Sequence, residues 1–306
     1  MVVARIHPGI AETPARPFLK WAGGKGQLLE QFDALFPRAN AFERYWEPFL
    51  GSGAVYFHLR DRGMLKGKSV FLSDINTALM DLWLHLQDEP QKVIHELKKL
   101  QLAYDPRKPE IYYRNRERFN GIGREESVEK SALLIALNRT CFNGLYRENS
   151  KGEFNVPVGR YTNPRILDEE NLWAVHQALQ QVSLENRPYV DVYEGAKEGD
   201  FVYFDPPYYP RNKTSQFAQY ARDGFRAEDH ETLTGLFIEL TRRGVHCMLS
   251  NSDAPFVVSL FEEARTVCPE VRIHKVLARR NINSKAGSRR AIHEVVVTNY
   301  PTLKSR

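Results

Sequence analysis

The chain has 306 residues, with 43 lysines and arginines against 38 aspartates and glutamates, a net charge of +5 and a pI of about 9.0. This length can bury a sizeable core and can hold a domain plus an insertion, and the modest basic excess is compatible with a polyanionic partner. Three cysteines without metal-like spacing indicate neither a disulfide framework nor a zinc site, and no apolar run reaches membrane length. We therefore expect a cytoplasmic protein with no metal site and no membrane partner.

Trp21 and Lys25 flank a glycine pair ahead of a helix that the pattern predicts over residues 27–36. The segment is not a phosphate-binding loop, because Leu19 and Gly26 stand where that motif needs a glycine and a Ser or Thr. Trp21 and Lys25 are therefore either parts of another ligand site or a packed ring and a solvated cation.

The next segment has the pattern of a nucleotide-binding unit. Residues 44–47 predict a strand that runs into the glycine turn Gly51-Ser52-Gly53, and residues 54–62 predict a helix. Tyr56 stands where the dinucleotide fingerprint needs a small residue, which disfavours a ligand with a pyrophosphate.

A second strand, predicted over residues 69–73, ends at Asp74. This position is about twenty residues beyond the glycine turn, where an acidic side chain commonly holds ribose hydroxyls. A glycine turn, an acidic ribose clamp and no pyrophosphate seat suggest S-adenosylmethionine as the ligand. Asp74-Ile75-Asn76 is equally compatible with a helix cap.

Residues 78–138 show helical spacing of apolar side chains without a strand signal, which indicates a helical insertion in an α/β sheet. The block leads into residues 138–157, where Ser-Lys-Gly between two extended segments predicts a hairpin turn. Asn, Arg and Lys interleaved with Leu, Phe and Tyr suit a surface that reads base edges and wedges between bases. An ordinary exposed hairpin has the same composition.

Residues 201–204 predict a short buried strand, and Asp205-Pro206-Pro207-Tyr208 follows it. Open α/β sheets place ligand chemistry at the carboxyl ends of strands, and two prolines make the backbone stiff and rich in free acceptors. The Asp205 carboxylate and a prolyl carbonyl can accept both N–H protons of an exocyclic amine while Tyr208 stacks on the base. The alternative is that Asp and Pro merely end the strand.

The rest of the chain alternates again, which implies a continued parallel sheet. We predict a loop over residues 213–225, a helix over 228–243, and strands over 245–250, 271–278 and 294–300. The basic residues between 279 and 290 form either a loop that touches phosphates or a solvated turn.

In combination, these segments resemble the Dam-like (D12 class, α-group) family of DNA adenine-N6 methyltransferases, in which the recognition domain precedes the catalytic motif. The resemblance extends from Phe18 to about Tyr300, with two departures: Gly26 follows Lys25, and a stretch of chain precedes Phe18. Six blocks in the family's order carry it: Phe18 to Lys25, Glu47 to Gly53, Asp74-Ile75-Asn76, Asn143-Gly144-Leu145 with Arg147, Gly152 to Pro157, and Asp205 to Tyr208.

The resemblance implies a fold, a cofactor and site residues. The fold is α/β: a Rossmann-like S-adenosylmethionine-dependent methyltransferase sheet over residues 1–77 and 166–306, with an inserted, mostly helical target-recognition domain over 78–165 that carries a β-hairpin. The catalytic residues would be Asp205, Pro206, Pro207 and Tyr208. The cofactor-binding residues would be Trp21, Lys25, Glu47, Phe49, Gly51, Gly53, Asp74 and Asp205. The DNA-binding residues would be Lys20, Asn143, Leu145, Arg147, Asn155 and Pro157.

We therefore expect site-specific transfer of a methyl group from S-adenosylmethionine to N6 of adenine in double-stranded DNA, within GATC or a GAT-containing site, by base flipping. The protein is expected to be monomeric when free, and the sequence leaves open whether a cognate restriction endonuclease exists. The alternatives are an inactive DNA-binding module, or methylation of an RNA base or a glutamine amide. Glutamine methyltransferases resemble one another in having Asn where this chain has Asp205, which argues against the last of these.

Overall fold

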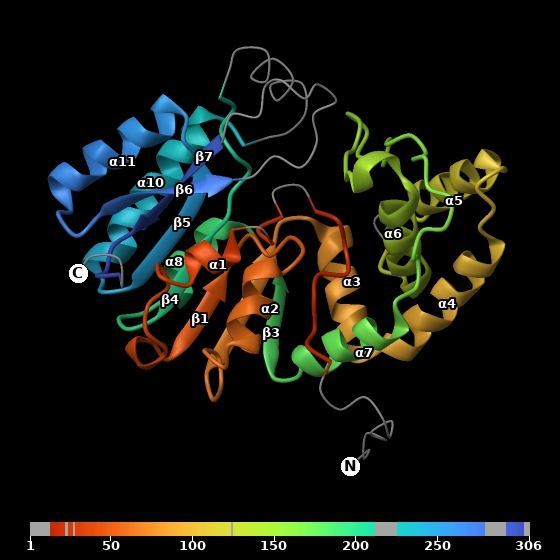
Figure 1. Cartoon of the computed structure of the whole chain (residues 1–306), viewed down its shortest axis with the longest axis horizontal. Helices are drawn as coiled ribbons and strands as arrows, with labels where there is room; N and C mark the ends of the chain where they lie inside the picture. Colours follow the sequence, from red (N-terminus) through yellow and green to blue (C-terminus); the bar gives the residue numbers. More distant parts are fainter. Residues whose placement is uncertain are drawn as a thin grey trace. The chain divides into compact units, whose positions relative to one another are not determined.

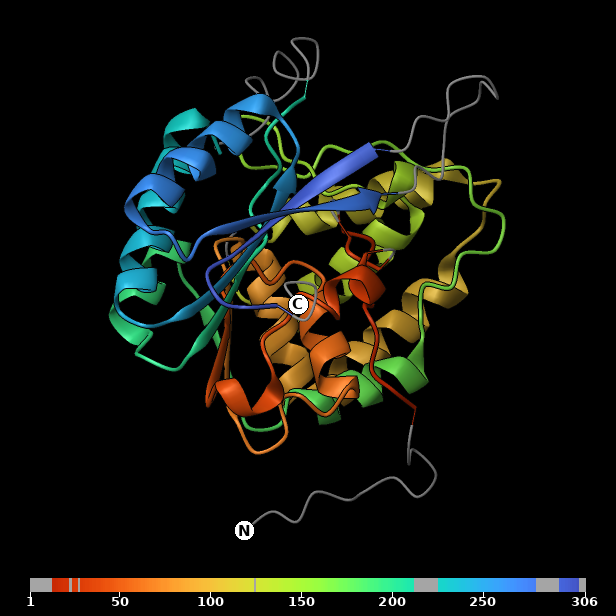
Figure 2. The same cartoon turned by 60° about the vertical axis from the view of Figure 1, so that its left-hand side comes forward.

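The computed structural model describes residues 13–21, 24–26, 28–123, 125–211, 225–278 and 292–302. The chain forms two compact units (Figures 1 and 2). The first comprises Met1–Gly24, Gly51–Asp61 and Asn76–Leu184, and the second Lys25–Leu50, Arg62–Ile75 and Glu185–Arg306. These units differ from the expected division at 77 and 165, because helices α2 (Ala54–Asp61) and α7 (Glu169–Ala178) group with the central helices. The functional division into catalytic and recognition domains stays a prediction.

A seven-stranded sheet in the order β3-β2-β1-β4-β5-β7-β6 dominates the second unit. Six of the predicted strand positions are confirmed, whereas β3, which crosses from the first unit into the second, was not predicted. The strands are β1 (Arg44–Glu47), β2 (Ser69–Asp74), β3 (Val182–Asn186), β4 (Phe201–Phe204), β5 (His246–Ser252), β6 (Arg272–Ala278) and β7 (Ile292–Thr298).

Strand β4 is apolar at every position because both of its faces are buried. Val202 and Phe204 join the core cluster that the sheet forms with helices α10 (Ala227–Arg242) and α11 (Pro255–Val267). Phe201 and Tyr203 face the other way, where Phe201 packs on Phe36 and Tyr203 packs on Phe32 of α1 (Leu29–Phe32). Figure 2 shows α10 and α11 together on one face of the sheet. The strand that carries the Asp-Pro-Pro-Tyr motif is therefore anchored on both faces.

The direction of the last two strands differs from the expectation. Strands β2, β1, β4 and β5 run parallel to one another, but β7 is antiparallel to both β5 and β6. Neighbouring parallel strands need a crossover connection, usually a helix, whereas antiparallel strands can be joined by a hairpin, and β7 is the next described strand after β6. The prediction of a continued parallel sheet was wrong for β6 and β7.

The remaining elements of the second unit are short, apart from α10 and α11. Helix α1 is briefer than the predicted 27–36, because the chain after Phe32 continues as turns to Phe36. The others are α8 (Val192–Gly195) and the 3-10 turns η1 (Ala39–Ala41) and η3 (Tyr189–Asp191). The loop predicted over 213–225, except Phe225, and the basic segment 279–290 lie outside the described residues.

The first unit is helical, as predicted for residues 78–138, and its central helix is α6 (Val128–Thr140), which contacts α3, α4 and α5. Residues 132–137 of α6 are buried on every side, so the helix is apolar all round. No helix among the described residues has both the length and the apolar character needed to cross a bilayer. The other helices are α2 (Ala54–Asp61), α3 (Thr77–Asp88), α4 (Pro90–Ala103), α5 (Pro109–Gly121), α7 (Glu169–Ala178) and the 3-10 turn η2 (Phe142–Gly144).

The predicted hairpin exists as a turn with two isolated antiparallel bridges, Cys141↔Val158 and Glu148↔Phe154, within what we call the hairpin segment, residues 141–158. Gly152 closes the turn with a φ of +75°, where its N–H donates to Asn149 O at 2.9 Å. A regular two-stranded ladder is absent from this described segment. Its two limbs share a few backbone hydrogen bonds, and the returning limb also bonds to side chains of α5.

Candidate active site

The Asp-Pro-Pro-Tyr motif begins directly after β4, at the carboxyl edge of the sheet. Glu47 ends β1 and Asp74 ends β2 at the same edge, because these strands are parallel. The order of the strands in the chain reverses between β1 and β4, and ligands of open α/β sheets bind at such a switch point. The motif therefore lies where this fold class places its chemistry.

The carboxylate of Asp205 is held by two donors that reach the same oxygen. Lys25 Nζ lies 2.6 Å and Ser250 Oγ lies 2.9 Å from Asp205 Oδ1. The Lys25 side chain is 3% exposed and that of Asp205 is 20% exposed, so the pair is largely shielded from water. Burial raises the pKa of the Asp205 carboxyl, and the Lys25 ammonium and the Ser250 hydroxyl oppose that rise. Within the described part of the chain, both of these donors reach Oδ1, and neither uses the second oxygen, Oδ2.

Ser250, on β5, also joins Asp205 to the buried core. Its hydroxyl lies 2.8 Å from Tyr203 Oη on β4. Because Ser250 donates its single proton to Asp205, Tyr203 must donate to Ser250. Burial raises the pKa of Tyr203 well above its usual range, so this phenol stays a neutral donor. Sequence reasoning missed Ser250, although three polar residues at the end of a buried strand, 250–252, were the signal that could have found it.

Tyr208 is fixed at both ends of its ring. Its hydroxyl donates to Glu294 Oε2 at 2.7 Å, and Lys25 Nζ lies over the ring, 4.6 Å from the centroid. Glu294 stands near the start of β7, opposite Ser252 of β5. Because β7 is antiparallel, its amino end reaches the edge where the parallel strands end. Glu294 is a second residue that sequence reasoning missed.

The backbone after the two prolines is held by side chains of β5. Tyr209 N–H donates to Asn251 Oδ1 at 3.1 Å, and Tyr209 O accepts from Ser252 Oγ at 2.6 Å. Prolines cannot donate to a strand ladder, so these two bonds replace the pairing that the loop lacks. The motif thus has little freedom to move.

Three predicted cofactor residues of the second unit line the ends of β1 and β2. Glu47 is 2% exposed and its Oε2 accepts from Tyr45 Oη at 2.7 Å. Phe49 stacks on Tyr189, with ring centroids 5.1 Å apart. The backbone carbonyl of Asp74 accepts a hydrogen bond from Asn186 Nδ2 at 2.8 Å.

The cap alternative is confirmed for Asn76. Asn76 is the N-cap of α3, and its side chain accepts from Leu79 N–H at 2.9 Å. Beside it, the side chain of Ile75 is 68% exposed.

The first unit holds the predicted residues Trp21, Gly51 and Gly53. A Cβ on Gly51 would lie 2.8 Å from Trp21 Cδ1, and one on Gly53 would lie 2.9 Å from Trp83 Cη2. Both glycines have a positive φ, +49° and +67°. No other residue type fits these positions without strain, so the glycine turn is a structural requirement of this unit.

Lys20 is brought against the start of the hairpin segment. Asn138 of α6 accepts from Lys20 N–H at 2.8 Å and donates to Lys20 O at 2.8 Å and to Gly144 O at 2.9 Å. Gly144 has a φ of +64°, and a Cβ there would lie 2.5 Å from Lys20 Cδ. Lys20 therefore lies against Gly144, the residue between Asn143 and Leu145.

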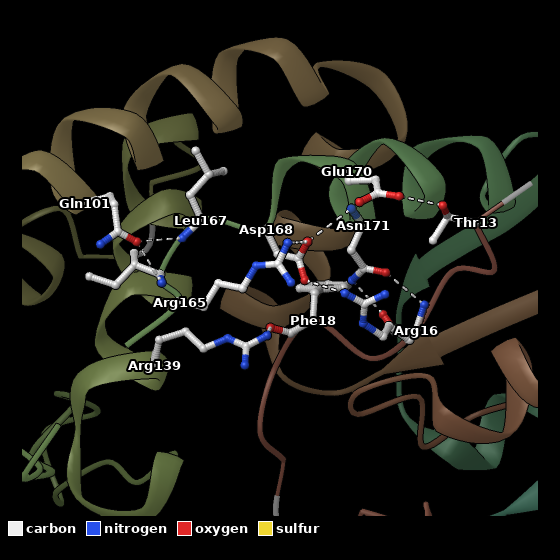
Figure 3. Close-up of polar contacts among 11 residues, drawn as sticks. Thr13, Arg16, Phe18, Gln101, Arg139, Arg165, Leu167, Asp168, Glu170 and Asn171 are labelled. Atoms are coloured by element: carbon white, nitrogen blue, oxygen red, sulfur yellow. Dashed lines mark hydrogen bonds and ion pairs between the residues drawn. The ribbon is translucent and has the colours of Figure 1, made fainter. Parts of the chain in front are cut away.

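The position of Lys20 depends on the segment before it, residues 16–18, whose contacts are shown in Figure 3. Arg16 N–H donates to Asn171 Oδ1 at 3.0 Å, and its guanidinium lies 2.7 Å from Asp168 Oδ2. Arg139 of α6 donates to Phe18 O at 2.7 Å. These bonds tie residues 16–18 to α6 and α7, which sets where Lys20 emerges.

Arg147 and Asn155 meet across the hairpin segment. Arg147 Nε donates to Asn155 Oδ1 at 2.5 Å, and Nη2 donates to Asn155 O at 3.2 Å. These bonds use one edge of the guanidinium fork and leave the end formed by Nη1 and Nη2 for another acceptor. Leu145 is half-buried and Pro157 is exposed. The Asn155 oxygen is thus occupied by Arg147, which the sequence did not predict.

An exposed aromatic ring stands at the start of the same segment. Phe142 is 50% exposed, and the next residue, Asn143, has a φ of +55°. Positive φ is uncommon outside glycine and marks a constrained backbone. Sequence reasoning did not single out Phe142, because an aromatic residue in an apolar-flanked segment more often belongs to a core.

The fold and the site define an α/β protein of the Rossmann-like methyltransferase class, with its polar loop after β4. A sequence model of the D12 class N6 adenine-specific DNA methyltransferases matches residues 21–282. The chain belongs to this family of methyltransferase enzymes, whose substrate is DNA.

Three relatives match over nearly their whole length. The Type II methyltransferase M.MjaIII of Methanocaldococcus jannaschii is 41% identical over 295 residues, which cover 93% of this chain and 99% of that protein. The Type II methyltransferase M1.LlaDCHI of Lactococcus lactis is 37% identical, with 93% and 95% covered. The DNA adenine methylase of Escherichia coli K12 is 30% identical, with 95% and 97% covered.

Proposed function

We propose that this protein transfers a methyl group from S-adenosylmethionine to N6 of a flipped-out adenine in duplex DNA, within GATC or a longer site that contains GAT. The observation that carries the proposal is the Asp205 carboxylate, whose Oδ1 is held by Lys25 and Ser250 directly after β4. A carboxylate with one oxygen fixed and the other free is an oriented acceptor for an amine.

The catalytic residues act by positioning and by polarising the amine. Asp205 Oδ2 accepts one N6 proton and the Pro206 carbonyl accepts the other, which localises the nitrogen lone pair. When S-adenosylmethionine is bound, its sulfonium would supply the methyl group: the N6 lone pair would form the N–C bond, the thioether would leave with the C–S electron pair, and the surplus N6 proton would pass to solvent. In-line displacement gains much of its rate from such alignment and from electrostatic stabilisation.

The cofactor supplies an electrophilic methyl group on a sulfonium. Asp74 at the end of β2 suits the ribose hydroxyls, and the exposed Ile75 beside it offers an apolar contact for a flat purine. The half-exposed Phe49 lies just beyond the end of β1, and the Lys25–Asp205 pair lies just beyond the end of β4. The residues present therefore fit the cofactor. Trp21, Glu47, Gly51 and Gly53 stay predictions of the sequence.

Base flipping is required because an amino group inside a duplex cannot meet a methyl donor. Unstacking costs a few kcal/mol, which the protein must offset. Tyr208 offers a ring for the extruded adenine, and the exposed ring of Phe142 offers an apolar wedge for the space that the base leaves. The positive φ of Asn143 supports a wedge that is held by its backbone.

Target recognition is assigned to the hairpin segment and Lys20. The free end of the Arg147 fork can pair with the two acceptors of guanine in the major groove. Leu145 and Pro157 are apolar and suit thymine methyl groups, Lys20 suits the first guanine, and Asn143 supplies a polar contact. The family position of Asn155 also touches DNA, but here it first serves Arg147.

The test is the reaction itself. A duplex library with randomised sequence is incubated with the protein and tritiated S-adenosylmethionine, and the products are read by methylation-sensitive sequencing. We expect label in N6-methyladenine within GAT-containing sites. Label in another base, in RNA or in a glutamine amide, or methylated adenines without GAT around them, would contradict the proposal. The type II names of two relatives also make a cognate restriction endonuclease a partner to seek in the neighbouring genes.

A further inference from the structure

Glu294 lies outside the Asp-Pro-Pro-Tyr motif, yet its carboxylate reaches the tyrosine of that motif. Strand β7 is paired on both sides, so the Glu294 backbone is opposite Ser252 of β5 and Val276 of β6. A residue in a strand with two partners has little backbone freedom. The carboxylate is therefore attached to a backbone position with little freedom, and from there it accepts a hydrogen bond from Tyr208 Oη at 2.7 Å.

The charge of the Glu294 carboxylate strengthens this hydrogen bond. The side chain is half-buried, and burial raises the pKa of its carboxyl; the bond from Tyr208 and the cations Lys25 and Arg211 oppose the rise, while Asp205 adds to it. Burial also raises the pKa of Tyr208 well above its usual range, so the phenol stays a neutral donor. A neutral donor on a carboxylate forms a charge-assisted hydrogen bond, which is stronger than a neutral one.

The bond fixes the direction of the Tyr208 side chain. The hydroxyl oxygen lies on the axis of the χ2 torsion, so a bond there sets where the far end of the ring lies, whereas packing and the cation over one face set the plane of the ring. The bonds of Tyr209 to Asn251 and Ser252 fix the backbone next to Tyr208, and Glu294 fixes the far end of its ring. The Lys25 ammonium lies over one face, which directs a flat base to the other.

We propose that Glu294 is a positioning residue that holds the far end of the Tyr208 ring at the place where the ring stacks on the flipped adenine. This inference rests on the proposed function, because it gives a role to the ring only if a base stacks there. In the proposed arrangement Glu294 contacts neither the substrate nor the methyl donor and acts through Tyr208 alone. Changing Glu294 should therefore have little further effect once Tyr208 has lost its hydroxyl.

The experiment compares Glu294→Ala, Glu294→Gln, Tyr208→Phe and the double variant Tyr208→Phe/Glu294→Ala with wild type. Single-turnover methyl transfer should slow about tenfold in Glu294→Ala and in Tyr208→Phe, the size expected for one charge-assisted hydrogen bond. Glu294→Gln keeps an acceptor oxygen and should stay within about threefold of wild type. The double variant should be no slower than the slower single variant, because both remove the same bond.

Two readouts separate positioning from a structural role. KM for S-adenosylmethionine and for DNA should change less than about twofold in Glu294→Ala, since the loss is in alignment. A duplex with 2-aminopurine at the target adenine should fluoresce more brightly with Glu294→Ala than with wild type, because a loosely held ring quenches the flipped base less. Glu270→Ala, an exposed glutamate before β6, is the matched control and should behave as wild type.

Equal rates for Glu294→Ala and wild type, or additive losses in the double variant, would overturn the inference while leaving the proposed function intact. A lower melting temperature with an unchanged rate per folded molecule would do the same. Failure of the proposed function is a different result: wild type itself would transfer no methyl group to adenine in duplex DNA.

Discussion

The loop after β4 and the hairpin segment are held in different ways. Side chains from the sheet strands β5 and β7 hold the loop at Asp205, Tyr208 and Tyr209, and Lys25 adds an ion pair. The hairpin segment instead has two isolated bridges and depends on one helix for much of its support.

Helix α5 adds a second support to the returning limb of the hairpin segment, which also bonds to the outgoing limb, for example from Asn155 N–H to Arg147 O at 3.0 Å. Asn120 donates to Phe154 O at 3.0 Å and accepts from Phe154 N–H at 2.8 Å, as a neighbouring strand would. Tyr112 donates to Val156 O at 2.7 Å. A catalytic group needs several buried contacts to hold its geometry. A surface that recognises bases can instead be held by a few side-chain hydrogen bonds.

The largest effect should come from removing the carboxylate that the sheet strands hold. Asp205→Ala should slow methyl transfer by about 10²–10³-fold or more, because the amine loses its principal acceptor. Tritium transfer from labelled cofactor to duplex DNA under single-turnover conditions measures it. A rate within about tenfold of wild type would remove Asp205 from the mechanism.

The next effect concerns the reading end of the hairpin segment. Arg147→Ala should lose about 1–3 kcal/mol of discrimination at one base pair and keep most of the methylation rate. Sequencing of a methylated randomised library, with wild type in parallel, shows which position relaxes. If Arg147 neutralises a phosphate instead, the loss will be uniform over sequences and the salt dependence of binding will weaken.

The clamp between α5 and the hairpin segment should matter for recognition more than for chemistry. Asn120→Ala leaves the N–H and C=O of Phe154 without their partner, and we expect a loss of about 1–3 kcal/mol in the free energy of unfolding. Discrimination among DNA sequences should fall further than the single-turnover rate on the best site. Asn115→Ala, on the same helix without that clamp, is the control. A rate loss equal to the specificity loss would contradict the comparison.

The smallest effect should come from the second donor on Asp205. Ser250→Ala removes a bond that favours the carboxylate, so the pKa of Asp205 should rise further and the acidic limb of the rate–pH profile should move to higher pH. Activity is lost as pH falls through that pKa, because a protonated acid no longer accepts from the amine. At neutral pH we expect about a tenfold slower rate or less. Ser259→Ala, on the exposed side of α11, should leave the profile unchanged.

Local sequence predicted six of the seven described strands and the place of the Asp-Pro-Pro-Tyr motif after β4. The apolar run of β4 predicted a strand buried on both faces, and the motif after it fell at the carboxyl edge, since parallel strands place their ends together. Pro90 and Pro109 open α4 and α5 as proline does at a first helical turn. Even Gly51 and Gly53 were recognisable, because only glycine tolerates their backbone.

The tertiary structure alone decided which side chains support that motif. Ser250 is 45 residues from Asp205 in the chain, and Glu294 is 86 residues from Tyr208. Their contacts depend on the order, direction and register of β4, β5 and β7, and a strand's own pattern states only which faces are buried. Asn120 likewise gains its role from where α5 packs, so no local signal distinguishes it from Asn115. The local pattern of a segment determines which of its side chains are buried, whereas the pairing of distant segments determines which side chains meet.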